Sequence, residues 1–406
     1  MDSRAILADQ LEALERRAAG APLDLSLLTD GLEAEREQGI TIDVAYRYFA
    51  TPKRKFIIAD APGHEQYTRN MVTAAAGSDA AVILVDITKL DLAARPVALL
   101  PQTRRHALLA HLLRVPGLVF AINKLDAVDD AGHAYAAVRE AVEAFAHDAG
   151  LAVAGIVPVS ALRGDNVTRA LDAPWYRGSS LLEVLERLPA ADEDADGKFA
   201  LPVQYVAKPD DADGCASAAG AGDRRRTFWG RIASGRVAVG DEVEVFPSAQ
   251  RARVVALQQP TRPHDGASAG RSVGLVLDRQ VDVSRGDWLA RPASLTGTRR
   301  FAATLAWLDT EPAVVGRRYR VRHGHRWVAA RIAAIESRLD IGTLARTPAD
   351  ALGVNEIGRV VVETQQPLPL APYARNRTSG ALVVVDPATN RTSGALLVEE
   401  PAREER

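Results

Sequence analysis

The sequence predicts an α/β domain with a parallel sheet, followed by two small all-β barrels. In residues 1–190, short apolar runs alternate with amphipathic helical stretches, which is the pattern of a parallel sheet with helices between its strands. Beyond residue 198 the pattern changes to short alternating strands separated by glycine and proline, as in residues 231–246. We place the α/β domain at 1–191, a linker at 192–198, and the barrels at 199–293 and 294–406.

Four apolar runs in the first domain are its predicted strands. Each run ends in a polar residue, as expected of strands that are buried on both faces and whose carboxyl ends open onto a ligand crevice. The predicted strands are 55–60, 80–86, 117–123 and 155–160, and the clearest helices between them are 102–113 and 133–149.

Composition excludes several classes of protein. With 50 Lys and Arg against 52 Asp and Glu, the net charge is −2, so no whole-chain basic field exists and we expect no nucleic-acid partner. Cys215 is the single cysteine, which rules out an intramolecular disulfide and argues against a cysteine-based zinc site. No uncharged run approaches the ~20 residues of a membrane span. We therefore expect a cytoplasmic protein without a membrane segment.

The first candidate site follows the first strand. Asp60 ends the strand, and Gly63 and His64 follow within the run Asp-Ala-Pro-Gly-His. A carboxylate at a strand end can hold Mg²⁺ through water, and a glycine lets a backbone N–H approach a γ-phosphate closely. This short motif is common in loops, so by itself it indicates little.

The second candidate site follows the two later strands. Asn123, Lys124 and Asp126 come at the end of one strand, and the run from Ser160 through Ala161 to Leu162 comes after the next. The Asp126 carboxylate can accept hydrogen bonds from N1 and the exocyclic N2 of guanine, and the stem of Lys124 can cover a base face. A backbone N–H after Ser160 can contact the base oxygen. Three motifs in this order on consecutive strand ends indicate a guanine-nucleotide site.

Thr41 lies in a fourth motif, residues 35–43, just before the first of these sites. In this setting its hydroxyl can bind Mg²⁺ and its backbone N–H can contact the γ-phosphate, as in a switch that orders when nucleotide binds. The alternative is an ordinary polar turn before a strand.

The runs GLEAEREQGITID, DAPGHEQYTRNM, NKLD and WYRGSSLLEVLE resemble the translation-factor class of P-loop GTPases, which carry two β-barrels after the GTPase domain. Within that class the chain is most similar to the large subunit of the heterodimeric bacterial sulfate adenylyltransferase. The runs LLPQTRRHALLAHLL, VDVSRGDWLA, PADALGVNEIGRVVVET and PYARNRTSGALVVVDPATN carry this second likeness, and the resemblance extends over nearly the whole chain.

The resemblance implies a function in sulfate assimilation. In this family a small ATP-sulfurylase subunit makes adenosine 5′-phosphosulfate and pyrophosphate from ATP and sulfate, and the large subunit hydrolyses GTP to drive that step. The implied ligands are GTP and Mg²⁺, and the implied partner is the small catalytic subunit. The implied roles are Mg²⁺ ligation by Asp60 and Thr41, γ-phosphate sensing by Gly63, positioning of water by His64, and guanine binding by Asn123, Lys124, Asp126 and Ser160.

The chain departs from the family at the phosphate loop. The pattern GxxxxGK(S/T) does not occur, and the single Gly-Lys pair, Gly197 and Lys198, is followed by Phe199. Such a loop supplies about five charge-assisted hydrogen bonds of ~1.5–3 kcal/mol, roughly 8–15 kcal/mol together, whereas nanomolar affinity corresponds to about 12 kcal/mol. We expect the first strand and the loop to precede residue 1, and the neighbouring strands to expose apolar faces without them.

Two explanations of the missing loop remain open. Either the chain starts too late, in its gene or as a truncated form, or it is a scaffold subunit without GTPase activity. A third hypothesis, a tRNA-binding elongation factor, requires a basic face across the barrels. Because no phosphate loop follows the barrels in this sequence, we expect no fused kinase.

Smaller features complete the prediction. His323 and His325 are interpreted as a pair on a β surface and not as a metal site. The string NRTSGAL occurs at residues 376 and 390 and predicts two strands of one hairpin. Residues 210–226 are interpreted as a loop inserted in the first barrel.

Overall fold

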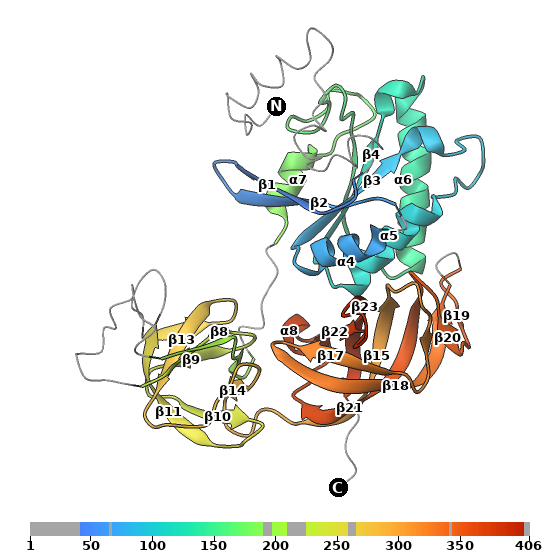
Figure 1. Ribbon diagram of the computed structural model, residues 1–406. Helices are drawn as coiled ribbons and strands as arrows, with labels where there is room; N and C mark the ends of the chain where they lie inside the picture. Colours follow the sequence, from blue (N-terminus) through green and yellow to red (C-terminus); the bar gives the residue numbers. More distant parts are fainter. Residues whose placement is uncertain are drawn as a thin grey trace, which may run out of the picture. The chain divides into compact units, whose positions relative to one another are not determined.

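A computed structural model of the protein describes residues 41–64, 67–189, 197–208, 225–258, 265–340 and 343–401 (Figure 1). The chain forms two compact units, which divide between Ala191 and Asp192. Most of the predicted linker and of the predicted inserted loop at 210–226 lies outside the described residues. The first unit holds the candidate nucleotide site and the second holds the barrels, so each is described by itself.

A three-stranded parallel sheet, in the order β3-β4-β5, is the centre of the first unit. Its strands are β3 (Ala80–Asp86), β4 (Gly117–Asn123) and β5 (Val153–Pro158). Every residue of β4 except Asn123 is buried, because the strand is apolar and lies between two neighbours. The parallel register sets Asp86 beside Asn123. The polar ends of two strands therefore meet at one edge, as the sequence predicts.

Helices flank this sheet. The helix α5 contacts β3 and β4, α6 contacts β4 and β5, and α7 contacts β5. The start of α7 is fixed by a capping box between Ser180 and Glu183, which satisfies backbone donors that the first turn leaves unpaired. The helices are α4 (Thr68–Ala76), α5 (Pro101–Leu112), α6 (Ala131–Asp148) and α7 (Leu181–Arg187), with short 3-10 turns η2 (Ile87–Lys89) and η3 (Leu125–Ala127).

Two further strands, β1 (Ala45–Ala50) and β2 (Lys55–Asp60), form a separate antiparallel pair. Among the described residues no strand pairs with the second edge of β2 or of β3. Ile57 on β2 is 65% exposed and Leu84 on β3 is 64% exposed. The prediction that these strands are buried on both faces is therefore wrong for β2 and β3. The exposure is the one expected where a neighbouring strand is lacking.

The first barrel is a seven-stranded antiparallel sheet, in the order β6-β14-β10-β11-β13-β8-β7, with a short β12-β9 pair beside it. Alternate residues point to one apolar core that includes Leu201, Val245 and Leu275. The strands are β6 (Ala200–Pro202), β7 (Tyr205–Ala207), β8 (Thr227–Arg231), β9 (Arg236–Ala238), β10 (Glu242–Phe246), β11 (Arg251–Gln258), β12 (Gly266–Ser268), β13 (Ser272–Leu277) and β14 (Trp288–Ala290).

The second barrel is closed. Six strands follow one another as β17-β22-β23-β15-β21-β18, and pairing between β17 and β18 completes the ring. Phe301, Leu305 and Trp307 fill its core. The elements are β15 (Thr298–Trp307), β16 (Ala313–Val314), β17 (Arg318–His323), β18 (Arg326–Leu339), β19 (Arg346–Thr347), β20 (Ala351–Leu352), β21 (Ile357–Leu368), α8 (Arg377–Gly380), β22 (Ala381–Val385) and β23 (Thr392–Pro401).

The two copies of NRTSGAL adopt different conformations. In the first copy Asn376 caps the short helix α8, with its Oδ1 accepting a hydrogen bond from the Ser379 backbone N–H at 2.8 Å. In the second copy, residues from Thr392 onward belong to β23, which pairs antiparallel with β22. The predicted hairpin pairing is confirmed, but the prediction that both copies are strands is wrong for the first.

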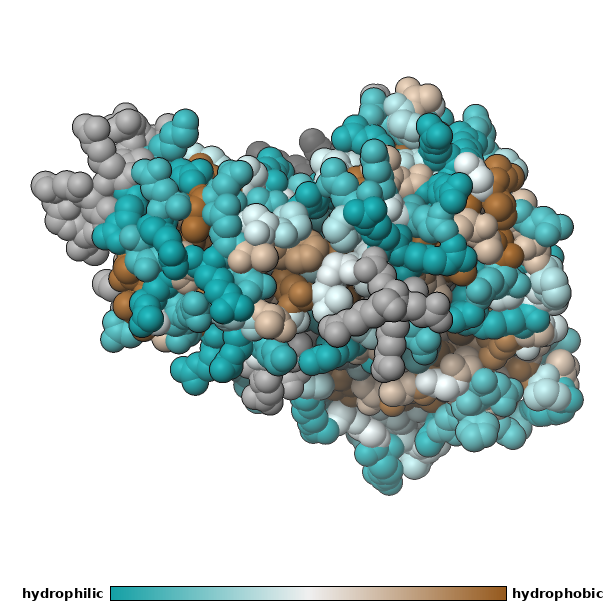
Figure 2. Space-filling view, turned by 90° about the horizontal axis from the view of Figure 1, so that it is seen from below, coloured by the Kyte–Doolittle hydropathy of each residue, from teal (hydrophilic) through white to brown (hydrophobic). Residues whose placement is uncertain are grey.

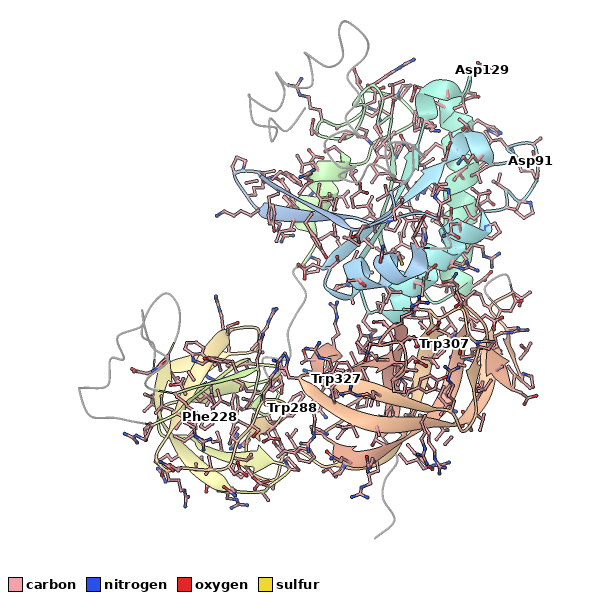
Figure 3. All side chains as sticks on the ribbon, viewed as in Figure 1. Asp91, Asp129, Phe228, Trp288, Trp307 and Trp327 are labelled. Atoms are coloured by element: carbon pink, nitrogen blue, oxygen red, sulfur yellow. The ribbon has the colours of Figure 1, made fainter. Side chains whose placement is uncertain are left out.

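A buried ring pair joins the two barrels. Trp288 of β14, which is labelled in Figure 3, stacks on His323 of β17, with ring centroids 5.2 Å apart and an interplanar angle of 13°. The predicted surface position of His323 is wrong, because this imidazole is fully buried. Its Nε2 donates to the Ser379 carbonyl at 3.0 Å, whereas Nδ1 has no hydrogen-bond partner among the described residues. A second contact joins Asn376 Nδ2 to the Ala233 carbonyl at 2.7 Å.

Hydrophilic residues cover most of the face seen in Figure 2, with small hydrophobic areas between them. Among the described helices, none combines the length and the apolar character that crossing a membrane requires.

The buried imidazole predicts a pH-dependent stability. Burial lowers the pKa of His323 from 6.5 to about 4. The unfolded chain therefore binds a proton more readily, and stability that is present above pH 6.5 is lost as the pH falls toward 4, by about 3 kcal/mol in full.

We expect His323→Phe to reduce this loss, whereas substitution of the exposed His147 by Gln leaves it unchanged. Urea unfolding followed by tryptophan fluorescence across this pH range measures the difference. If the free energy of unfolding fell equally steeply with decreasing pH in the wild type and in H323F, the assignment of this pH dependence to His323 would be contradicted.

Candidate guanine-nucleotide site

Asn123 connects the ends of β4 and β5. Its Oδ1 accepts hydrogen bonds from the backbone N–H of Lys124 at 2.8 Å and of Ala161 at 2.9 Å. The turn after β4 is sharp because Lys124 adopts a left-handed backbone conformation, with φ of 67°. One amide side chain thus fixes the positions of two loops that sequence analysis assigned to the same site.

Asp126 and Ser160 form the second link between these loops. The Ser160 hydroxyl donates to Asp126 Oδ1 at 2.5 Å and accepts from the Arg163 backbone N–H at 3.2 Å. Ser160 is buried, so its hydroxyl is held in place. The hydrogen bond from Ser160 lowers the pKa of the Asp126 carboxyl. Asp126 is thus an ionised acceptor at neutral pH, as guanine N1–H and N2–H donors require.

Lys124 is held by a residue to which the sequence analysis gave no role. Its Nζ lies 2.8 Å from Asp86 Oδ2 at the end of β3. Burial alone raises the pKa of Asp86, but hydrogen bonds from Lys124 and Thr88 outweigh it and keep the pKa below its ordinary value. The signal for Asp86 was its place at the carboxyl end of an apolar run, the same signal that identified Asn123.

Asn166 supports the loop after β5 and was also missed. It is buried, its Nδ2 donates to the Pro158 carbonyl at 2.8 Å, and its Oδ1 accepts from the Leu171 backbone N–H at 2.8 Å. Leu162, in the same loop, is 87% exposed. A polar residue in an irregular loop carries no periodic signal, so sequence reasoning had no means of finding Asn166.

Two of the residues predicted to act at the phosphates, Gly63 and His64, lie in the loop after β2. Gly63 and His64 are exposed, and a Cβ built on Gly63 meets no described atom within 4 Å. Packing against the described residues therefore does not explain the glycine. Gln102 at the start of α5 donates through Nε2 to the Gly63 carbonyl at 2.8 Å, which ties this loop to the helix.

The segment that follows Thr41 is anchored to the helix α4. Asn70 on α4 donates through Nδ2 to the Ile42 carbonyl at 2.7 Å, directly after Thr41. Thr41 and Asp60 offer hydroxyl and carboxylate oxygens, the donors that Mg²⁺ prefers. Among the described residues, no cluster of three or more His, Cys, Asp or Glu side chains could hold a metal ion.

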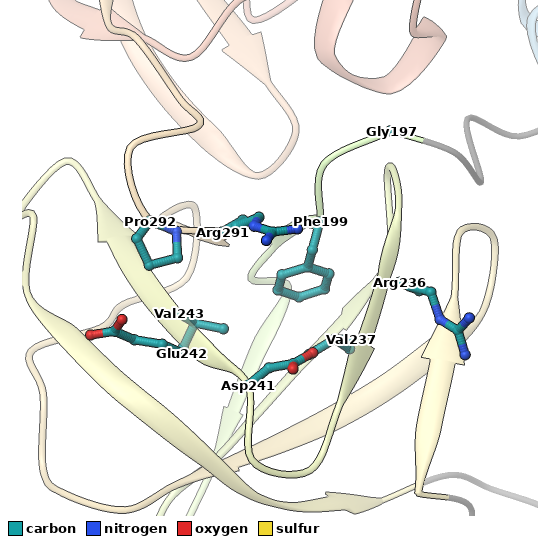
Figure 4. Close-up of a pocket in the computed structure, with 9 residues that line it drawn as sticks. All are labelled: Gly197, Phe199, Arg236, Val237, Asp241, Glu242, Val243, Arg291 and Pro292. Atoms are coloured by element: carbon teal, nitrogen blue, oxygen red, sulfur yellow. The ribbon is translucent and has the colours of Figure 1, made fainter.

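A pocket of about 410 Å³ lies in the first barrel (Figure 4). Phe199 and Val243 contribute apolar surface, and Arg236, Asp241 and Glu242 contribute charges of both signs. None of the predicted site residues lines it. With its charges opposed, the pocket has no clear preference for an anion or a cation.

Comparison with known proteins defines the class of the chain. The family described as elongation factor Tu GTP binding domain matches residues 4–190, and the family described as GTP-eEF1A C-terminal domain-like matches residues 300–399. The predicted fold class, a GTPase domain of the translation-factor class followed by β-barrels, is confirmed. Among solved structures, Sup35 complexed with GDP is similar over 98% of this chain and 88% of the other, with a TM-score of 0.47 and 22% identity.

Relatives with curated names define the family. Sulfate adenylyltransferase subunit 1 of Chromobacterium violaceum is 42% identical over 95% of this chain and 78% of the relative, and that of Laribacter hongkongensis is 40% identical with the same coverage. The bifunctional enzyme CysN/CysC of Mycobacterium tuberculosis is 43% identical over 95% of this chain, which spans 61% of that enzyme. The chain belongs to the sulfate adenylyltransferase subunit 1 family.

The Ser160 hydrogen bond gives a direct prediction for the site. In Ser160→Ala the carboxyl of Asp126 loses its strongest stabilising donor, so its pKa rises toward the ordinary value. Carbon-13 NMR titration of the aspartate carboxyls measures the change, with Ser78→Ala, just after the end of α4, as the control. An Asp126 pKa that is the same in S160A and the wild type would show that this bond does not set the ionisation.

Proposed function

We propose that the chain is the GTPase subunit of a sulfate adenylyltransferase. In this proposal a separate catalytic subunit forms adenosine 5′-phosphosulfate and pyrophosphate from ATP and sulfate, and GTP hydrolysis on this chain drives that unfavourable step. The observation that carries the proposal is the hydrogen-bonded link between the loops after β4 and β5, in a chain of the subunit 1 family.

The base end of the proposed site selects guanine. Asp126 accepts hydrogen bonds from N1–H and N2–H, and a backbone N–H in the loop from Ser160 to Leu162 donates to the base oxygen. The Ala161 N–H can do so only by leaving Asn123 Oδ1. The Lys124 stem, held by Asp86, covers one face of the ring. Adenine has an acceptor at N1 and lacks the C2 amino group, so an ionised Asp126 disfavours it.

The phosphate end positions the reacting groups. Thr41 and Asp60 would hold Mg²⁺, which when bound neutralises charge on the phosphate oxygens. The Gly63 backbone N–H donates to the γ-phosphate, and His64 orients the attacking water. A GTPase transition state needs an oriented water and stabilised negative charge more than a strong base, so an exposed imidazole suffices. Gln102 keeps the Gly63 carbonyl turned toward α5 and so holds the peptide that joins Gly63 to His64.

The sequence has no GxxxxGK(S/T) loop, so in this proposal the chain as written binds GTP weakly. Fusing an apolar strand followed by such a loop to its N-terminus should raise the affinity for GTP by at least ~10³-fold, because several charge-assisted hydrogen bonds are gained. Isothermal titration calorimetry of both proteins measures the gain. The control is the same fusion with the loop lysine replaced by alanine, and equal affinity of all three proteins would contradict the proposal.

Coupling to sulfate activation is the decisive property. The chain carrying the fused loop should be co-expressed with the small ATP-sulfurylase subunit, and sulfate-dependent ATP–pyrophosphate exchange measured with and without GTP. We expect GTP to stimulate exchange several-fold and Asp126→Ala to abolish that stimulation.

The same assay separates the alternative function. Exchange that requires the chain but is unaffected by GTP would identify a scaffold subunit without GTPase activity. Exchange that is the same with or without the chain would contradict the whole proposal.

A further inference from the structure

The second barrel presents a basic and aromatic surface. The residues Arg318, Arg320 and Arg322 alternate along β17 and point away from the core, whereas Tyr319, Val321 and His323 are buried. Trp327 of β18 lies directly opposite Arg322, on the same side of the sheet (Figure 3). We name Arg318, Arg320, Arg322 and Trp327 the arginine–tryptophan face.

Trp327 is the centre of this face. Its side chain is 42% exposed, and the Arg320 and Arg322 guanidinium carbons lie 4.9 and 5.8 Å from the ring centroid. On the other neighbouring strand, β22, Val383 is paired with Arg322 and is 39% exposed. The face thus combines an apolar centre with two guanidinium groups that the ring holds in place.

The arginines of this face differ from several others of the same barrel, which have carboxylate partners. These pairs are Arg317 with Glu311 and Asp386, Arg300 and Arg331 with Glu363, Arg338 with Glu356, and Arg359 with Glu336 and Glu399. Within the described part of the chain, no ion pair joins Arg318, Arg320 or Arg322 to a carboxylate.

The arrangement also opposes local stability. Arg318 lies directly across the β17–β18 pair from Arg331, and like charges in that position destabilise a sheet. Arginines two apart on one strand add further repulsion. Glu363 compensates the charge of Arg331, and the Trp327 ring and the Gly324 carbonyl hold Arg322. Among the described residues, however, no carboxylate forms an ion pair with the three arginines of β17.

We propose that the arginine–tryptophan face is a docking surface for a protein partner, which it binds through an acidic segment that carries a bulky apolar side chain. Carboxylates of the partner would pair with the guanidinium groups in the planar geometry that arginine favours, and its apolar side chain would pack against Trp327 and Val383. Tryptophan and arginine are the residues that most often dominate the binding energy of protein interfaces.

A protein segment fits this face better than a nucleic acid. Nucleic-acid binding depends on an extended basic field, whereas carboxylates such as Glu363 and Asp386 lie on the neighbouring strand and loop, and the whole chain has a net charge of −2. The proposal does not depend on the GTPase function proposed above.

The test uses the full chain and a fluorescein-labelled peptide in which aspartate and glutamate residues flank one phenylalanine. Fluorescence anisotropy should show saturable, salt-sensitive binding to the wild type, weakened at least ~10-fold by R320E/R322E and by Trp327→Ala. The control R253E/R299E replaces two exposed arginines outside the face and alters the net charge by the same amount as R320E/R322E. It should bind the peptide as tightly as the wild type does. Thermal melting of each variant confirms that it folds.

Three outcomes would overturn the proposal. The first is that the peptide does not bind the wild type. The second is that R320E/R322E and R253E/R299E weaken binding equally, since the effect would then be one of net charge. The third is that a labelled tRNA binds more tightly than the peptide and loses its affinity in R320E/R322E, which would make the face a nucleic-acid surface.

Discussion

Two hydrogen bonds between the loop after β4 and the loop after β5 are the constraint on which the candidate site depends. Asn123 Oδ1 accepts from the Ala161 backbone, and the buried Ser160 hydroxyl donates to Asp126. Parallel pairing brings these strand ends to one edge of the sheet, but only the side-chain bonds fix the carboxylate, amide and backbone donors relative to one another. The two bonds hold in place the groups that the proposed guanine site uses, and such fixed geometry reduces the ordering cost of binding.

The phosphate half of the site is built differently. It follows the β1–β2 pair, which is not hydrogen-bonded to the β3-β4-β5 sheet among the described residues, and apolar side chains such as Ile57 and Leu84 are exposed on the facing strands. Gln102 and Asn70 tie its loops to helices, not to a strand. Among the described residues, side-chain hydrogen bonds join the two loops of the proposed base half, whereas the loops of the proposed phosphate half are tied to helices. In our proposal, guanine selectivity and GTP affinity are therefore separate properties.

Long periodic or apolar segments were predictable and short irregular ones were not. The strands β2, β3 and β4 match their predicted bounds, because each is a continuous apolar run ending in a polar residue. The two NRTSGAL copies could not be told apart locally, since the helical turn of the first depends on Asn376, whose amide bonds Ala233 in the other barrel. The surface position predicted for His323 was wrong for a similar reason. The side chain lies on the inward face of β17, and the ring that covers it, Trp288, is distant in the sequence and could not be identified from it. Asp86 was visible as a strand end, yet its role required knowing that Lys124 reaches it.

Guanine selectivity by the Asp126 carboxylate is the central claim, and exchanging the base and the side chain together tests it most directly. Xanthine has a carbonyl at C2 where guanine has an amino group. The Asp126 carboxylate can accept a hydrogen bond from the guanine amino group, and the side-chain amide in Asp126→Asn can donate one to the xanthine carbonyl. Saturation-transfer NMR detects weak ligands and can compare GDP with xanthosine diphosphate on both proteins. We predict that the wild type prefers GDP and that D126N prefers xanthosine diphosphate. The same preference in both proteins would contradict the account.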